Sequence, residues 1–230
     1  MANKYWVVIP AAGVGKRMQA DRPKQYLTLC DKSVIEHTIA CFSHHPEIAG
    51  IVVSLSATDS YWLELDLHSD APLHRAEGGE ERCHSVLNSL EVVAQYAHED
   101  DWVLVHDAAR PCLTRVDLDK LISDVEEDEV GGILAVPVQD TMKRDNGTAR
   151  IDHTVDRQGL WHALTPQMFR LGILRSALQK ALADGFTVTD EASAIEYMGK
   201  QPKLVEGSRS NIKVTRPDDL ALAEYYLSCK

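Results

Sequence analysis

PAAGVGKRM, at residues 10–18, follows a short apolar run from Tyr5 to Ile9 that is long enough for one buried strand. After it the chain continues through Arg22-Pro23-Lys24, so the loop beyond the strand is rich in lysine and arginine. Glycines let the backbone approach phosphate oxygens, main-chain N–H groups surround those oxygens, and cations neutralise their charge. Pro23 restricts the local backbone and favours one direction for Lys24. We therefore predict a polyphosphate-binding loop at the end of the first strand.

Two better-known glycine-rich loops do not match this stretch. A P-loop that ends at Gly15-Lys16 needs glycine at position 10 and Ser or Thr at position 17, where the chain has Pro10 and Arg17. A dinucleotide-binding fingerprint that begins at Gly13 has Met18 at its third glycine position. The loop belongs to a third class, and the alternative interpretation is a glycine turn with ordinary surface cations.

Length, charge and cysteine content limit the class of protein. The 230 residues suffice for one α/β domain or two small ones, and no repeat or linker divides them, so we predict a single domain over residues 1–230. The net charge of −11 argues against binding to nucleic acids or to anionic membranes, and a cationic loop in an acidic chain favours a small anionic ligand. The five scattered cysteines lack a C-x-x-C motif, and there is no signal peptide or membrane-length apolar run, which together predict a cytoplasmic protein with reduced thiols.

Strand and helix patterns alternate along the chain. β-Branched and apolar runs predict buried strands, and apolar residues at helical spacing predict the helices between them. This alternation predicts an α/β fold with a mostly parallel sheet and helices on both faces. Further strands are predicted at residues 51–55, 102–105, 133–138, 203–205 and 212–214. Helices are predicted at residues 34–42, 59–67 (short), 86–97, 118–125 and 173–182. Two more helices are predicted, one that opens at 189–191 and one that begins at Thr215 with Asp218 in a capping box.

The pattern breaks at residues 139–158. Asn146-Gly147 is a strong hairpin-turn signal, and the flanking segments carry too few apolar residues to form a core of their own. We predict a β-hairpin arm that packs on another subunit. The alternative is a hairpin that lies on its own domain.

Polar residues follow several of the predicted strands, and ligands of parallel sheets bind beyond the carboxyl ends of the strands. Asp107, directly after a buried strand, is a candidate hydroxyl or Mg²⁺ partner, or alternatively a turn or helix cap. Lys213 interrupts an apolar pair and is either a site residue or a solvent-exposed lysine. No nucleophile–base pair stands out. Cations, glycines and one or two acids suit phosphoryl or nucleotidyl transfer, where positioning and charge stabilisation supply most of the catalysis.

A set of motifs, in this order and over essentially the whole chain, resembles the 2-C-methyl-D-erythritol 4-phosphate cytidylyltransferase family of the non-mevalonate isoprenoid pathway. The motifs are P-A-A-G-V-G-K-R-M (10–18), P-K-Q-Y (23–26), G-G-E-E-R-C-H-S-V (78–86), V-H-D-A-A-R-P (105–111), D-T-M-K (140–143), T-V-D-R (154–157), L-T-P-Q (164–167), T-D-E-A-S (189–193) and N-I-K-V-T-R-P-D-D-L (211–220). The first motif alone indicates only a sugar-nucleotidyltransferase-like fold, whereas the complete set is specific. The resemblance implies a Rossmann-like, nucleotide-diphospho-sugar transferase fold.

The resemblance implies an enzyme that transfers the cytidylyl group of CTP to 2-C-methyl-D-erythritol 4-phosphate and releases pyrophosphate, with Mg²⁺ and as a homodimer whose arm reaches the neighbouring site. It implies that Arg17 and Lys24 stabilise the transition state and that Arg157 and Lys213 position the substrate phosphate. Further residues are implied as nucleotide contacts, namely Ala11, Ala12, Gly13, Gly15, Lys16, Gly79, Glu80, Ser85 and Ala108. Others are implied as contacts to the methylerythritol phosphate, namely Asp107 (also the metal candidate), Arg110, Thr141 and Arg157 from the partner, Thr165, Thr189 and Lys213.

Two alternatives to this activity remain open. A cytidylyltransferase of the same fold could act on another polyol phosphate, such as ribitol 5-phosphate. A regulatory module could bind CTP without releasing pyrophosphate, although it would leave Arg157 and Lys213 without a role.

Overall fold

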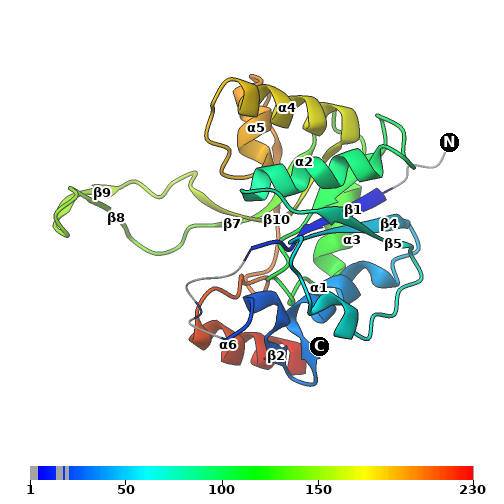
Figure 1. Ribbon diagram of the computed structural model, residues 1–230. Helices are drawn as coiled ribbons and strands as arrows, with labels where there is room; N and C mark the ends of the chain where they lie inside the picture. Colours follow the sequence, from blue (N-terminus) through cyan, green and yellow to red (C-terminus); the bar gives the residue numbers. More distant parts are fainter. Residues whose placement is uncertain (1–4, 14–17, 19–20, 230) are drawn as a thin grey trace.

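The computed structural model describes residues 5–13, 18 and 21–229. Its centre is a seven-stranded sheet in the order β11-β7-β10-β6-β1-β4-β5, shown in Figure 1. Of these seven strands, β10 runs antiparallel to both of its neighbours, and the other pairings are parallel. The strands are β1 (Tyr5–Pro10), β4 (Ile48–Leu55), β5 (Leu73–Glu77), β6 (Trp102–Val105), β7 (Gly132–Pro137), β10 (Trp161–Arg170) and β11 (Lys203–Glu206).

Helices cover both faces of the sheet, as the alternating pattern predicts. Along β1, Tyr5, Val7 and Ile9 face one layer, and Trp6 and Val8 face the other, because successive strand residues point to opposite sides. The first layer holds α1 (Val34–Ser43) and α3 (Arg115–Val125), and the second holds α2 (Arg82–Val93), α4 (Leu171–Ala183) and α5 (Glu191–Tyr197). The predicted mostly parallel α/β fold is confirmed.

Local sequence signals set the ends of several helices. The Ser33 hydroxyl accepts a hydrogen bond from the backbone N–H of Glu36, and the Glu36 carboxylate accepts one from Ser33, which forms a capping box at the start of α1. Gly185 follows α4 with φ of 70°, the left-handed conformation in which glycine commonly ends a helix. These ends lie within one or two residues of the predicted ones.

The predicted hairpin is present and projects away from the sheet (Figure 1). Strands β8 (Met142–Asp145) and β9 (Ile151–Val155) pair antiparallel across a turn in which Gly147 has φ of 87°. Most of its side chains are exposed, including Ile151, so in the single chain it contributes little apolar burial. Its role in a homodimer stays a prediction.

The structure corrects five local predictions. Helix α2 spans Arg82–Val93 rather than the predicted 86–97, because its N-cap is Glu81 and the chain turns after Val93. Strand β10 was not predicted, because its motif, L-T-P-Q, contains a proline that disfavours a strand. Residues 212–214 form a loop rather than a strand, and residues 59–67 contain a single 3-10 turn, η3 (Trp62–Glu64). The last helix, α6 (Pro217–Ser228), begins after Arg216, and Asp219 rather than Asp218 accepts the capping hydrogen bonds from Thr215 and Arg216.

Neither a disulfide nor a membrane-spanning helix occurs among the described residues. The five cysteines lie in the described residues and form no disulfide there. None of the helices that the structure describes has both the length and the apolar character needed to cross a membrane.

Candidate active site

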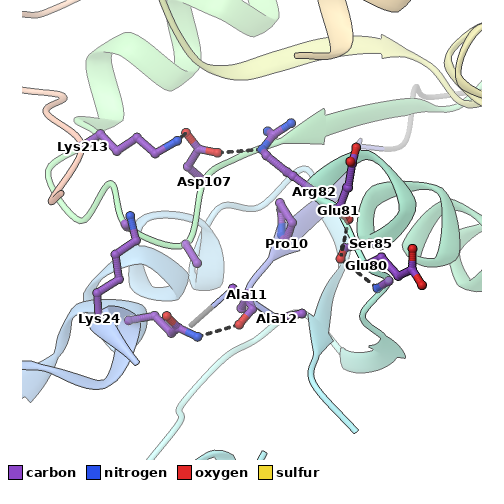
Figure 2. Close-up of a pocket in the computed structure, with 15 residues that line it drawn as sticks. Pro10, Ala11, Ala12, Lys24, Glu80, Glu81, Arg82, Ser85, Asp107 and Lys213 are labelled. Atoms are coloured by element: carbon purple, nitrogen blue, oxygen red, sulfur yellow. Dashed lines mark hydrogen bonds and ion pairs between the residues drawn. The ribbon is translucent and has the colours of Figure 1, made fainter. Parts of the chain in front are cut away.

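A cavity of about 200 Å³ opens at the carboxyl ends of β1, β5 and β6, where the parallel-sheet rule places a ligand. Figure 2 shows its lining as sticks. The sequence predicted Ala11, Ala12, Gly13, Lys24, Gly79, Glu80, Ser85, Asp107, Ala108 and Lys213 as site residues, and the structure brings all of them to this cavity together with Pro10, Gln25, Glu81, Arg82 and Ala109. The predicted Gly15, Lys16 and Arg17 lie outside the described residues.

The backbone after β1 forms one wall of the cavity. Ala11 continues the pairing with β4, because its N–H donates to the carbonyl of Ser54 over 2.9 Å. A Cβ built on Gly13 would meet no atom within 4 Å, so packing of the described residues does not require glycine there. A Cβ on Gly78, by contrast, would come within 2.2 Å of the Ala12 Cβ. Gly78 lets two loops approach, and the space beside Gly13 is available to a ligand.

The opposite wall is the turn into α2. The N–H of Gly79 donates to the Ser85 hydroxyl over 3.0 Å, and that hydroxyl donates to the Glu81 carbonyl over 3.2 Å (Figure 2). Ser85 is buried and Glu80 is exposed. Ser85 therefore fixes the shape of the turn, which was predicted to contact the nucleotide.

Lys24 lies on the short 3-10 turn η2 (Lys24–Tyr26), and its ammonium donates to the Val214 carbonyl over 3.0 Å. The neighbouring Gln25 is buried and donates to the Ala11 carbonyl over 2.6 Å. The first bond joins Lys24 to the loop before α6, and the second ties the turn to the glycine loop. These bonds hold the Lys24 ammonium at the cavity without a ligand. Pro23 was expected to favour one direction for Lys24, and this placement agrees with that expectation.

Five charged residues meet beside the cavity, and we call them the Asp107 cluster: Arg82, Asp107, Arg110, Glu191 and Lys213. Asp107 Oδ1 accepts from Arg82 Nε over 2.9 Å, and Oδ2 contacts Lys213 Nζ at 2.9 Å and Arg110 Nε at 3.3 Å. Figure 2 shows Lys213 and Arg82 approaching Asp107 from opposite sides. Lys213 therefore lines the cavity and pairs with Asp107, and its role toward a substrate stays a prediction.

The charges of this cluster support one another. Burial by itself raises the pKa of Asp107, but the charges of Arg82, Lys213 and Arg110 outweigh it and hold that pKa well below its usual range. Burial also lowers the pKa of Arg82, and Glu191 and Asp107 more than reverse this effect, so its pKa is raised. Three cations face two carboxylates, which leaves one positive charge in excess for an anionic ligand.

The predicted role of Asp107 as a Mg²⁺ ligand fits this geometry poorly. Both carboxylate oxygens already bind cationic side chains, and those cations would repel a divalent ion. Elsewhere among the described residues, Glu81, Cys83 and His84 place possible ligand atoms within 4.8 Å of one another, but thiol and imidazole groups differ from the oxygen donors that Mg²⁺ prefers. The geometry gives Asp107 a role in orienting Arg82, Arg110 and Lys213.

A second cavity of about 240 Å³ adjoins the first, because Arg82, Asp107 and Lys213 line both. The predicted substrate contacts Arg110, Thr165 and Thr189 line this second cavity. Thr189 is exposed, whereas Thr165 is buried. The two groups of predicted contacts therefore fall into two neighbouring spaces with a shared charged wall.

The Thr165 hydroxyl is already engaged by the protein. It accepts a hydrogen bond from the N–H of Asp107 over 3.1 Å and lies 2.9 Å from Nδ1 of the buried His106, whose Nε2 donates to the Arg110 carbonyl. The bond to the Arg110 carbonyl requires the proton of the His106 ring to be on Nε2. Nδ1 therefore carries no proton and accepts a hydrogen bond from the Thr165 hydroxyl. Burial lowers the pKa of His106 to about 4, and the imidazole is neutral at physiological pH. Thr165 thus anchors the loop that carries Asp107, and its predicted contact to the substrate remains a prediction.

The predicted residues Thr141 and Arg157 do not line either of the two cavities that adjoin the Asp107 cluster. Both are exposed near the base of the hairpin, and the Arg157 guanidinium donates to the Gln139 carbonyl. This placement is compatible with the expectation that they act in the site of a second subunit.

Sequence reasoning assigned no role to Arg82 or Glu191. Both stand inside quoted motifs, G-G-E-E-R-C-H-S-V and T-D-E-A-S, but their side chains meet across a sequence separation of 109 residues. The available signal was a charge of each sign in two motifs, one that follows β5 and one at the start of α5. Only the three-dimensional structure shows that the two charges pair.

A sequence model of the 2-C-methyl-D-erythritol 4-phosphate cytidylyltransferase family matches residues 5–229. The chain belongs to this family. Family members of that name from Pseudomonas putida (strain GB-1) and Vibrio vulnificus (strain CMCP6) are 58% and 56% identical to it, over 94% and 96% of this chain and 92% and 93% of theirs. A Francisella tularensis structure of the same name is 36% identical, with a TM-score of 0.85 over 97% of this chain and all of that one.

Proposed function

We propose that the chain is a cytidylyltransferase that converts CTP and 2-C-methyl-D-erythritol 4-phosphate into 4-diphosphocytidyl-2-C-methyl-D-erythritol and pyrophosphate. The observation that carries this proposal is the pair of adjoining cavities with a shared cationic wall, in a chain that belongs to the cytidylyltransferase family. One cavity is lined by the glycine loop and the turn before α2, which suit a nucleotide. The other is lined by Arg110, Thr165 and Thr189, which suit a polyol phosphate.

The chemistry requires two anions to approach each other. The phosphate of the acceptor attacks the α-phosphorus of CTP, the bond to the β-phosphate oxygen breaks, and pyrophosphate leaves with that electron pair. The attacking oxygen is already anionic, so no general base is needed. Lys24 and Lys213 reduce the repulsion, and a cation that gains contact as charge builds up on the α-phosphate lowers the barrier. Arg17 is proposed for the same role as Lys24, and Mg²⁺ is proposed as a cofactor carried by the triphosphate rather than by Asp107.

The reaction is tested by pyrophosphate release with CTP and Mg²⁺ in three parallel assays. The acceptors are 2-C-methyl-D-erythritol 4-phosphate, ribitol 5-phosphate and none. We expect release with the methylerythritol phosphate alone. Release with ribitol phosphate instead would keep the mechanism and change the substrate. Binding of CTP without release in any assay would support a regulatory module.

We further propose a homodimer in which the hairpin arm carries Thr141 and Arg157 to the partner's site. Three observations support the proposal: these residues are exposed, they are absent from the linings of the two cavities that adjoin the Asp107 cluster, and the hairpin projects. The cysteines, which form no disulfide in the described residues, favour the cytoplasm as its compartment.

Mixing two inactive variants tests the shared site. Lys24→Ala and Arg157→Ala chains are each expected to be nearly inactive as homodimers. After unfolding and refolding together, a mixed dimer has one site with both wild-type residues, provided that Arg157 acts across the interface. A statistical mixture should therefore recover about a quarter of the wild-type activity per chain. Refolded mixtures that stay as inactive as the parent variants would contradict the arm's role.

A further inference from the structure

The wall between the two cavities contains a side chain to which neither the sequence nor the proposed mechanism assigns a role. Arg82, at the start of α2, lines both cavities, as do Asp107 and Lys213. Its side chain is 29% exposed, while the carboxylate of Glu191 behind it is 0% exposed. Arg82 is thus reachable from the cavities, and Glu191 is shielded from them.

Arg82 binds two carboxylates at once. Its Nη1 donates to Glu191 Oε1 over 2.6 Å, its Nη2 donates to Glu191 Oε2 over 3.0 Å, and its Nε donates to Asp107 Oδ1 over 2.9 Å. Two parallel bonds to one carboxylate fix the plane of the guanidinium as well as its position. A lysine at this place could not reproduce the arrangement, because an ammonium lacks the planar fork.

Burial of the charged Glu191 carboxylate costs free energy, so we expect the charge to have a role in the protein. A buried ion pair is seldom more stable than an apolar pair of similar volume, so stability alone is a weak reason for its presence. The consequence that the geometry does show is orientation. Glu191 fixes Arg82, Arg82 binds Oδ1 of Asp107, and Oδ2 of the same carboxylate binds Lys213.

We infer that Glu191 is a positioning residue that acts through Arg82, and that Arg82 contacts the phosphate of the incoming acceptor at the boundary between the two cavities. This inference rests on the proposed function. The excess positive charge of the Asp107 cluster faces both cavities, and a phosphate placed between Arg82 and Lys213 would balance it. Without Glu191 the guanidinium would keep its charge and lose its fixed plane.

The substitution Glu191→Gln tests this role. Glutamine keeps the volume but offers one acceptor oxygen, and its NH₂ group would face an Arg82 N–H. We expect kcat/KM for the methylerythritol phosphate to fall on the order of 10²-fold, the scale of a misplacement of about 1 Å, while the Kd for CTP measured by calorimetry changes little. A matched control is Glu99→Gln, which removes the carboxylate that binds Arg175 far from the cavities, and it should leave both quantities unchanged.

A double-mutant cycle separates positioning from a structural role. If Glu191 acts through Arg82, the Arg82→Lys, Glu191→Gln double variant should lose little more kcat/KM than the worse single variant. Fully multiplied losses, or a Glu191→Gln protein that melts earlier but keeps wild-type kcat/KM, would overturn the inference. If Glu191→Gln fails to fold, the Arg82→Lys variant alone tests the inference. An unchanged kcat/KM for the acceptor in that variant would exclude Arg82 from the acceptor site.

The proposed function and this inference fail in different ways. A wild-type protein that releases no pyrophosphate with any acceptor contradicts the proposed function. An active wild type with an equally active, folded Glu191→Gln variant contradicts the inference and leaves the function in place.

Discussion

Replacing Lys24 by alanine should lower the turnover of pyrophosphate release by about 10²–10³-fold, the scale for removing one preorganised donor that stabilises developing charge. The structure explains why the effect should be this large. The ammonium is held by the Val214 carbonyl beside the glycine loop, and Gln25 ties its turn to Ala11. No reorganisation of that turn is needed when charge builds up on the α-phosphate.

The measurement is kcat at saturating CTP and acceptor, with the melting temperature recorded for the same preparation. Lys32→Ala is the matched control, because Lys32 is exposed and lines neither of the two site cavities. We expect it to keep wild-type turnover. A loss of less than tenfold in Lys24→Ala would remove Lys24 from the role of transition-state stabiliser.

Replacing Asp107 by asparagine should have the largest effect on stability. The carboxylate is buried and is shared by Arg82, Arg110 and Lys213, so its removal leaves cations without their partner. Removing one member of a buried ion pair costs about 3–5 kcal/mol of unfolding free energy. Arg110 bears most of this loss, because its side chain is 10% exposed whereas that of Lys213 is 38% exposed.

Urea unfolding of wild type and of Asp107→Asn measures this loss as a shift of the midpoint at constant slope. Asp184→Asn is the control, since its pair with Lys180 lies on the surface between residues one helical turn apart, and it should change the midpoint little. The pKa of Asp107 is depressed in the folded state, so its contribution is complete above the unfolded-state value of about 3.8 and is lost as pH falls below it. The difference between wild type and Asp107→Asn should be constant from pH 7 to pH 5 and shrink at lower pH. If the urea midpoint of Asp107→Asn equalled that of wild type at pH 7, the folded state would not need Asp107 to neutralise its cationic partners.

Much of the candidate site was predictable because its residues follow strands. Ala11 to Gly13 and Asp107 each come soon after a predicted strand, and parallel strands bring their carboxyl ends to one edge of the sheet. The assignment of Asp107 to a metal could not be checked from the chain, because residue type alone does not show what binds a carboxylate. Arg110 is close to Asp107 in the chain, but its other cationic partners, Arg82 and Lys213, come from distant segments that no local pattern brings together.

What the sequence determined by itself is the local and periodic part of this protein. Buried strands, amphipathic helices and the hairpin turn at Gly147 depend on neighbouring residues, and the α/β fold follows from their alternation. The tertiary structure alone decided that β10 enters the sheet antiparallel, that Lys213 reaches Asp107 from a loop, and that Glu191 orients Arg82. The physical reason is that an ion pair or a strand partner depends on where distant segments cross, and only the packed core fixes those crossings.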